Sequence, residues 1–255
     1  MKHIELYEKL NALYPPALSA EWDHDGIMVM KDGDQPVCRV LIALDLTAEC
    51  AKTALLGGYD LIITHHPLLF RPLDALYPKD PLTARALMLY EKGISVFSFH
   101  TRLDCAEGGV NDALAELFEL SDLTVFEVEG LPMGRIGRLP EEKSAKELAE
   151  EIKEKLGCPQ LSLSLPQKRV ARLALLGGSG GSEWKDALAA GADGYLTGEA
   201  GHHHLLDAGE NALCLFAAGH DYTELPVCRA LKRRVDGLLQ GAKVDVYQKI
   251  AISRQ

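Results

Sequence analysis

The stretch Leu61-Ile62-Ile63-Thr64-His65-His66-Pro67-Leu68-Leu69-Phe70 decides the fold of this chain. Its apolar, β-branched start follows the turn-like Gly57-Gly58-Tyr59-Asp60 and predicts a buried strand. Pro67 cannot donate to a sheet and restricts His66 to an extended conformation, so we expect the strand to end at the two histidines. Because open α/β sheets bind ligands at the carboxyl ends of their strands, this pair is either a metal site or two satisfied polar side chains.

Strands and helices alternate on both sides of this stretch. Helices are predicted at about 3–13, 47–56, 81–92, 108–120 and 144–156, and further strands at about 27–30, 38–44, 94–99, 161–165, 170–176, 194–197 and 213–218. Thr47 and the pair Ser144 and Glu147 are typical of helix caps. The alternation predicts an α/β fold with largely parallel sheets.

The sequence also resembles itself. Residues 39–44 match 172–176, and residues 58–64 match 191–197. Further on, His100 and Asp104 correspond to His220 and Glu224, so that each half has a His-x-x-x-carboxylate motif after a predicted strand. We therefore expect two similar α/β lobes, with a metal site at strand carboxyl ends between them. Residues 1–128 plus about 215–255 would form the first lobe, with most of the ligands, and about 129–214 the second.

Composition excludes several classes of protein. The chain has 255 residues, 47% of them hydrophobic and 25% charged, and no apolar run is long enough to span a membrane. The N-terminus has no secretory signature, and the six cysteines are dispersed without a Cys-x-x-Cys motif, so we expect reduced thiols and a cytoplasmic location. A net charge of −10 argues against general binding to nucleic acid or anionic membranes.

The candidate ligands all stand at or just past predicted strand ends, where parallel strands bring distant residues to one edge of a sheet. They are His65, His66, His100, Asp104, His220 and Glu224. Imidazole suits zinc, iron, copper and nickel, whereas carboxylates suit harder ions and can bridge two of them. Four to six mixed donors favour a two-metal site with ions roughly 3.5–4 Å apart. The alternative is that the histidines only make structural hydrogen bonds, which is the interpretation we keep for His3 and His24.

Two other motifs allow more than one interpretation. The run His202-His203-His204 could bind metal, but as the start of a helix we expect it to be exposed, with His203 the best placed of the three. The loop Gly177–Gly181 could form a phosphate nest. It lacks the Gly-Lys-Ser/Thr of a P-loop and a dinucleotide fingerprint, so we expect it to serve tight turning. Cys105 has no assigned base, and no Gly-x-Ser-x-Gly elbow occurs, so a covalent nucleophile is unsupported.

Together, these motifs resemble the Nif-three-like proteins, also called GTP cyclohydrolase I type 2 homologues. The resemblance rests on Glu21-Trp22-Asp23-x-x-Gly26, Thr64–Phe70, His100-Thr101-x-Leu103-Asp104 with Gly108-Gly109-Val110-Asn111, Thr197-Gly198-Glu199, and Gly219-His220-x-x-Thr223-Glu224. It implies a two-lobed α/β protein with a dinuclear metal centre and a hexameric ring. The implied metal ligands are His65, His66, Asp104, His220 and Glu224, and the resemblance places His100 near the metals, in proton transfer or behind the ligands.

These observations predict a metal-dependent hydrolase acting on a nucleotide-like or phosphorylated small molecule. Two divalent ions per chain are expected, and zinc, iron, manganese, nickel and cobalt all suit the donors. The same residues would also serve a metal-handling or regulatory protein that carries or senses ions without turnover. Expected partners are therefore a small-molecule substrate or a metal, and the family resemblance implies further copies of the chain in a homo-oligomer.

Overall fold

The computed structural model describes residues 1–248, which divide into two compact units. Residues Met1–Leu103 and the described residues from Cys228 on form the first unit, and Asp104–Val227 form the second. The chain enters the second unit within α4 (Thr101–Cys105) and leaves it within α10 (Pro226–Leu238). This division differs from the expected boundaries near residues 128 and 215, because residues 104–128 and 215–227 lie in the second unit.

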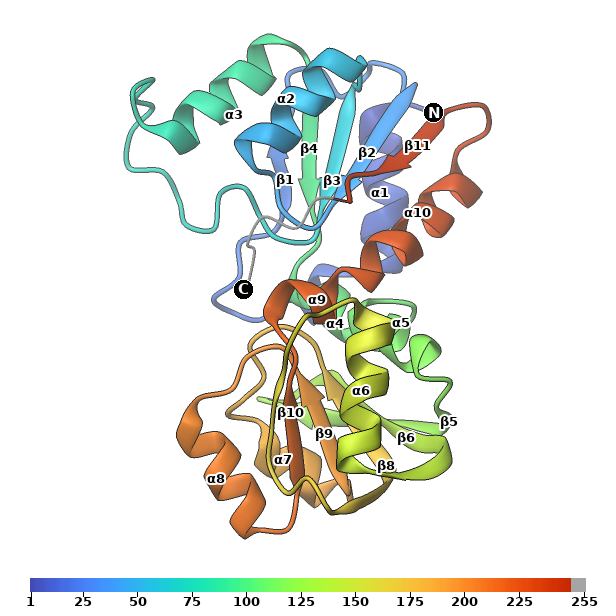
Figure 1. Cartoon of the computed structure of the whole chain (residues 1–255). Coiled ribbons are helices and arrows are strands. Elements are labelled where there is room, and N and C mark those ends of the chain that lie inside the picture. The colour runs from blue at the N-terminus through green and yellow to red at the C-terminus, as the bar shows by residue number, and fades with distance from the viewer. Residues whose placement is uncertain (249–255) are drawn as a thin grey trace. The chain divides into compact units, whose positions relative to one another are not determined.

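The first unit is built on a five-stranded sheet (Figure 1). In spatial order its strands are β1 (Gly26–Val29), β4 (Ser95–Ser98), β3 (Leu61–Thr64), β2 (Arg39–Ala43) and β11 (Lys243–Val246). The last four are parallel to one another, and β1 pairs antiparallel with β4. All four residues of β3 are buried, as expected for a central strand that is covered on both faces.

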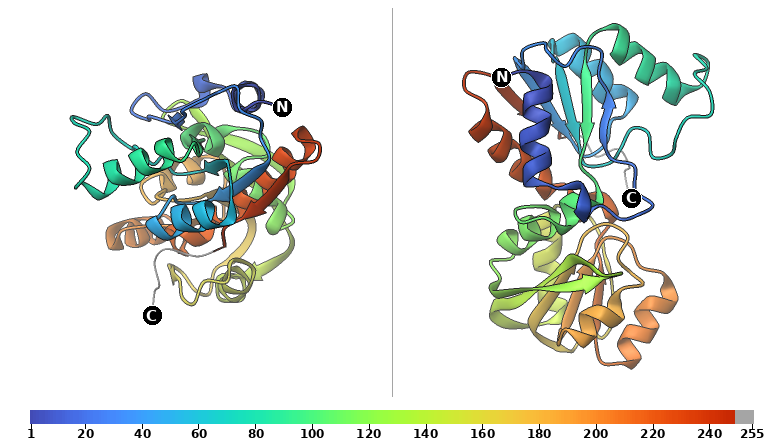
Figure 2. Two further views of the ribbon diagram at one scale, coloured as in Figure 1. Left: turned by 90° about the horizontal axis from the view of Figure 1, so that it is seen from above. Right: turned by 180° about the vertical axis from the view of Figure 1, so that it is seen from behind.

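Helices cover both faces of this sheet, as the front and back views show (Figures 1 and 2). They are α1 (His3–Leu13), α2 (Ala48–Gly57), α3 (Pro81–Glu91) and α10, and a 3₁₀ turn at Pro16–Leu18 follows α1. One core joins α2 and α3 to alternate strand residues such as Ile62 and Val96. On the other face, Tyr7 of α1 packs against Phe97, with ring centroids 5.2 Å apart. Thr47 accepts a hydrogen bond from the Cys50 amide and caps α2, as predicted.

The second unit contains a six-stranded mixed sheet. Its spatial order is β5 (Ser121–Val128), β6 (Leu131–Ser144), β8 (Arg169–Leu176), β9 (Gly194–Thr197), β10 (Cys214–Ala217) and β7 (Ser162–Leu163). Only β8, β9 and β10 are parallel to one another; the other pairings are antiparallel. The prediction of largely parallel sheets is thus confirmed for the first unit and holds for half of the second.

Two cores cover the two faces of this second sheet. The helices of the unit are α5 (Val110–Leu117), α6 (Ala145–Leu156), α7 (Trp184–Ala189), α8 (His202–Glu210) and α9 (His220–Glu224). One core joins α5 and α6 to β6 and β8, and the other joins α7 and α8 to β9 and β10. Ser144 and Glu147 form the predicted capping box of α6, with Glu147 Oε2 2.8 Å from the Ser144 amide.

The largest difference from the sequence analysis is the hairpin β5–β6. Residues 127–130 looked like a soft domain boundary, yet Glu129 and Gly130 form its turn with positive φ, and both strands belong to one sheet. β10 is likewise held in the second unit by its pairing with β9. Each unit does contain three adjacent parallel strands in chain order, β2-β3-β4 and β8-β9-β10. Their origin by duplication stays a prediction.

Within residues 1–248, no helix combines the length and the apolar composition needed to cross a lipid bilayer.

Candidate metal centre

His65 and His66 stand where β3 ends, as the sequence predicts. β3 ends at Thr64, but its backbone pairing with β2 continues, since the His65 amide donates to Ala43 at 3.3 Å and the His66 amide to Leu44 at 3.0 Å. The Thr64 hydroxyl donates to the His66 carbonyl at 2.7 Å. The two histidines are therefore held by backbone hydrogen bonds rather than by a mobile loop.

His65, His66 and His100 each place their Nδ1 against an oxygen atom that can only accept. His65 Nδ1 lies 3.0 Å from the carbonyl oxygen of Phe99, His66 Nδ1 2.8 Å from Asp45 Oδ1, and His100 Nδ1 2.9 Å from Asp23 Oδ1. A carbonyl or ionised carboxylate has no hydrogen to give, so Nδ1 carries the proton in all three rings. Nε2 of each neutral ring then bears the lone pair that a metal ion or a proton can take.

The three imidazoles also converge. Each offers one ring nitrogen, and these nitrogens lie within 4.8 Å of one another. The ring centroid of His65 is 4.9 Å from that of His66 and 5.3 Å from that of His100. His65 is fully buried and the other two are partly exposed, so the cluster reaches the surface through His66 and His100. This is the geometry of a metal-binding set or of a proton-transfer residue beside one.

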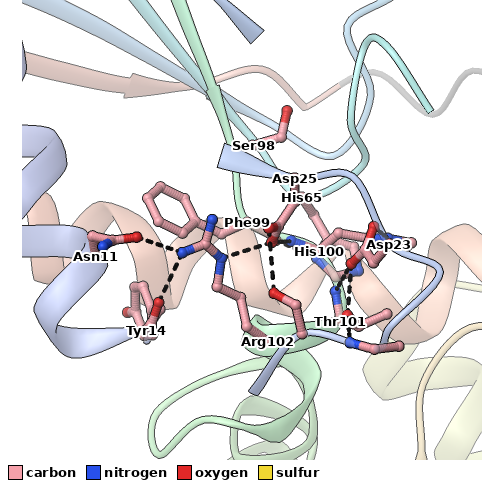
Figure 3. A network of polar contacts seen from close by, with 12 residues as sticks. Asn11, Tyr14, Asp23, Asp25, His65, Ser98, Phe99, His100, Thr101 and Arg102 are labelled. Atoms are coloured by element: carbon pink, nitrogen blue, oxygen red, sulfur yellow. Dashed lines mark hydrogen bonds and ion pairs between the residues drawn. The ribbon is translucent and has the colours of Figure 1, made fainter. Parts of the chain in front are cut away.

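Two aspartates from the turn before β1 hold the end of β4 (Figure 3). Asp23 accepts hydrogen bonds from the ring of His100 and from the amide and hydroxyl of Thr101, the hydroxyl at 2.6 Å. Asp25 accepts from the His100 amide at 3.0 Å and from Arg102 Nε at 2.7 Å. The ring and the backbone of His100 are thus fixed by separate carboxylates.

Arg102 completes this network from inside the unit. Its side chain is almost fully buried and donates to Asn11 Oδ1 at 2.6 Å and to the Tyr14 carbonyl at 3.1 Å, as Figure 3 shows. The guanidinium also lies over the ring of Phe99, 4.9 Å from its centroid. A buried arginine is tolerated only when its charge and donors are matched, and Asp25 supplies the opposite charge.

The electrostatics of Asp23 follow from these contacts. Burial by itself would raise the pKa of this carboxyl, but hydrogen bonds from His100 and Thr101 and the nearby imidazole outweigh burial and lower the pKa to about 2. Asp23 is therefore ionised at neutral pH, as an acceptor that orients His100 must be.

In the second unit, His220 and Glu224 lie one helical turn apart on α9. His220 Nε2 is 3.1 Å from Glu224 Oε2, and His220 Nδ1 is 3.5 Å from Glu199 Oε2. Gly219 before them has φ +103, a conformation that favours glycine, and it redirects the chain from the end of β10 into α9. The predicted His-x-x-x-carboxylate motif therefore places its two side chains together.

Asp104 belongs to the same unit. It lies in α4, where Asn111 Nδ2 donates to its carbonyl oxygen at 3.2 Å. Asp104 and Glu224 each place a carboxylate oxygen within 4.8 Å of the other. The second unit thus assembles two carboxylates and, through Glu224, the imidazole of His220, a donor set that suits divalent cations.

Three amides of the glycine loop Gly177–Gly181 donate to side chains of the protein. The amide of Gly177 donates to Asn111, that of Gly178 to the Thr223 hydroxyl at 3.1 Å, and that of Gly180 to the Thr197 hydroxyl at 3.0 Å. Gly178 has φ +70, and a Cβ there would lie 2.2 Å from Glu224 Oε1. Glycine at this position lets the loop approach the candidate ligand closely.

The remaining candidate residues lie in surroundings that do not favour a role in metal binding or catalysis. His3 is buried and contacts Ser95 at 2.8 Å and Asp60 at 3.2 Å, whereas His24 is exposed. The run His202–His204 begins α8, with His202 and His203 exposed. Burial, with the neighbouring Asp104 charge, raises the pKa of the Cys105 thiol to about 12, which makes it a poor nucleophile.

Sequence reasoning missed the oxygen acceptors behind the histidines. Asp45 and Asp25 are not among the candidate residues of the sequence analysis, and Asp23 enters it only as part of a family motif. A usable signal existed, since Asp45 lies two residues past the end of β2 and residues 21–26 are one of the motifs that carry the family resemblance. The Phe99 carbonyl leaves no signal in the sequence, because any residue would supply the same oxygen.

Comparisons with known proteins agree with the resemblance of the motifs. A Lactococcus lactis protein named GTP cyclohydrolase 1 type 2 homolog is 34% identical over 249 residues, which cover 95% of this chain and 93% of the relative. The Protein NIF3 homolog of Schizosaccharomyces pombe is 31% identical over 241 residues, covering 86% of this chain and 84% of the relative.

Solved structures show the same fold. Reduced HcgD from Methanocaldococcus jannaschii is 30% identical, with a TM-score of 0.82 over 98% of both chains. The Staphylococcus aureus hypothetical protein SA1388 has a TM-score of 0.92 at 24% identity and covers 100% of this chain and 99% of its own. The sequence model of Duf34/NIF3 (NGG1p interacting factor 3) matches residues 1–253. The chain therefore belongs to the Duf34/NIF3 family.

Proposed function

We propose that this protein is a metal-dependent hydrolase acting on a nucleotide-like or phosphorylated small molecule, with two divalent ions held by His65, His66, Asp104, His220 and Glu224. The observation that carries the proposal is the convergence of three imidazoles whose Nδ1 protons are all committed to oxygen acceptors. This tautomer suits metal binding by His65 and His66, because it leaves Nε2 as the donor atom.

The donor chemistry fits such ions. The first unit contributes imidazoles and the second contributes the carboxylates of Asp104 and Glu224 with the imidazole of His220. Zinc, iron, manganese, nickel and cobalt all accept such mixed ligation. When bound, two ions of this kind lower the pKa of water and polarise a scissile group.

The chain's own residues supply orientation and proton transfer. His100 is the proposed proton-transfer residue, because Asp23 holds its Nδ1 proton and its ring centroid lies 5.3 Å from that of His65 and 5.6 Å from that of His66. Asp45 and the Phe99 carbonyl hold His66 and His65 in the same way. A carboxylate can bridge two ions, a role that suits Glu224 or Asp104.

The substrate class and assembly are inferred from the family. Relatives bear the name GTP cyclohydrolase 1 type 2 homolog, which supports a nucleotide-like substrate. We also propose a hexameric ring, which native mass spectrometry would report as six times the 27.8 kDa chain mass. Within residues 1–248, none of the six cysteines is in a disulfide and five of them are buried, which supports the proposed cytoplasmic location.

The test combines metal analysis with a substrate panel. Protein stripped of metal and reloaded separately with zinc, iron, manganese, nickel or cobalt is assayed on nucleotides, phosphoesters and cyclic amides. We expect about two ions per chain and turnover in the wild type, both reduced in His65→Ala and unchanged in His24→Ala, whose side chain is exposed.

Each contrary result has a definite meaning. Labile, transferable ions without turnover of any compound would contradict the hydrolase and favour a metal carrier or sensor. Fewer than one ion per chain, with no change in His65→Ala, would contradict the metal centre itself.

A further inference from the structure

Three rings gather at the outer edge of the histidine cluster in the first unit. Trp22, Phe70 and His100 lie with every pair of ring centroids 6.0 Å apart. The two contacts with His100 are T-shaped, at 72° and 73°, and the contact between Trp22 and Phe70 is tilted by 48°. None of these pairs is stacked face to face, and an edge-to-face contact covers only one face of one of its two rings.

Trp22 and Phe70 are also unusually exposed. Trp22 is 53% exposed and Phe70 48%, whereas the other tryptophan, Trp184, is 5% exposed. Large aromatic side chains usually add to stability by burial, and half of that benefit is forgone here. Adjacent exposed aromatics beside a candidate reaction centre are typical of a ligand-binding surface.

The position of these rings limits what they can bind. Both touch His100, whose centroid lies 5.3 Å from that of His65 and 5.6 Å from that of His66. A flat ring resting on Trp22 or Phe70 would therefore carry its substituents beside the three imidazoles. Flat heteroaromatic rings stack on such faces whatever their edge pattern, because every base has a π-face.

We infer that Trp22 and Phe70 form a stacking surface that binds the planar heteroaromatic ring of the substrate and positions the rest of the molecule at the histidine cluster. This inference rests on the proposed function for its substrate, and it adds the chemical class and the residues that recognise it.

Binding of a ring can be measured without turnover. Three probes share ribose 5-phosphate and differ in the ring, namely GMP, UMP and nicotinamide mononucleotide, and ribose 5-phosphate alone is the ringless control. In Trp184→Phe, Trp22 is the only tryptophan of the chain, so its fluorescence reports contact with the ring directly. We expect saturable quenching by the ring-bearing probes and none by ribose 5-phosphate.

Calorimetry on the metal-loaded protein gives the second readout. Loss of one stacking ring weakens binding roughly 5- to 150-fold, so we expect Trp22→Ala and Phe70→Ala to fall in that range. Trp22→Phe keeps a flat face and binds more tightly than Trp22→Ala. Tyr90→Ala is the matched control, since it removes an equally exposed aromatic (47%) from the same unit and leaves affinity unchanged.

The outcomes separate this inference from the proposed hydrolase. Ring-dependent binding without any turnover sustains the stacking surface and contradicts the hydrolase. Probe affinities that are equal with and without a ring, or unchanged in both alanine variants, overturn the stacking surface even if the metal-loaded protein hydrolyses a substrate.

Discussion

His66 Nδ1 lies 2.8 Å from Asp45 Oδ1, so that a residue two positions past the end of β2 fixes the tautomer of a residue two positions past the end of β3. Neighbouring parallel strands end at one edge, and here that arrangement pairs a carboxylate with an imidazole. Such partners raise the basicity of the ligand nitrogen and orient the ring.

Replacing this carboxylate should weaken metal binding without removing a proposed ligand. In Asp45→Asn we expect metal affinity to fall roughly 10- to 100-fold, because the amide cannot accept the Nδ1 proton as strongly. Competition with a chromophoric chelator measures the change. The control is Asp74→Asn, at an exposed position of the same unit; equal losses in both variants would show that the role of Asp45 is not specific.

Stability should depend on the ionisation of Asp23. Its pKa is about 2 in the folded protein against 3.8 ordinarily, so its ionised form stabilises the fold above about pH 4, and this contribution, roughly 2 kcal/mol, is lost as pH falls to about 2. Denaturant unfolding of metal-free wild type and Asp23→Asn checks this. We expect the stability gap between them to narrow over that range, and a gap that stays constant from pH 5 to pH 2 would contradict it.

Replacing Arg102 should lower the free energy of unfolding more than replacing most other polar residues of the first unit. Arg102→Met leaves Asp25 buried without its cation, which typically costs about 3–5 kcal/mol of unfolding free energy. Arg138→Met removes an exposed pair with Asp122, 3.6 Å long, and should cost under about 1 kcal/mol. Urea denaturation of both variants compares them, and similar losses would contradict a structural role for the buried network.

Substitution of Gly178 tests whether the glycine loop packs against Glu224, a candidate metal ligand. Gly178→Ala combines a positive φ with a Cβ 2.2 Å from Glu224 Oε1, whereas Gly130→Ala has φ +77 and no atom within 4 Å. The backbone strain alone costs about 1–2 kcal/mol, which we expect for Gly130→Ala in thermal unfolding. Gly178→Ala should cost more and also lower metal affinity, because Glu224 must move. Equal behaviour of the two variants would refute this packing.

Much of the local structure could be predicted from sequence. Capping residues mark the starts of two helices at Thr47 and Ser144. Pro67 marks the end of β3, and β-branched runs predict strands β8 to β10. All of these signals act over a few residues. The hairpin β5–β6 could not be predicted, because Glu129 and Gly130 turn the chain without the usual Asn-Gly signal. In addition, most residues of β5 are exposed, so the strand lacks a clear apolar pattern. β11 was missed for a related reason, since a four-residue edge strand is defined by its pairing with β2.

The sequence by itself determined which side chains stand at strand ends, since the apolar runs, the glycines and Pro67 fix where each strand stops. Only the tertiary structure decided which ring nitrogen of each histidine carries the proton. The oxygens that hold the protons of His65, His66 and His100 come from residues 34, 21 and 77 positions away. A hydrogen bond forms only where packing brings donor and acceptor within about 3 Å, and that packing depends on the whole unit rather than on any one segment.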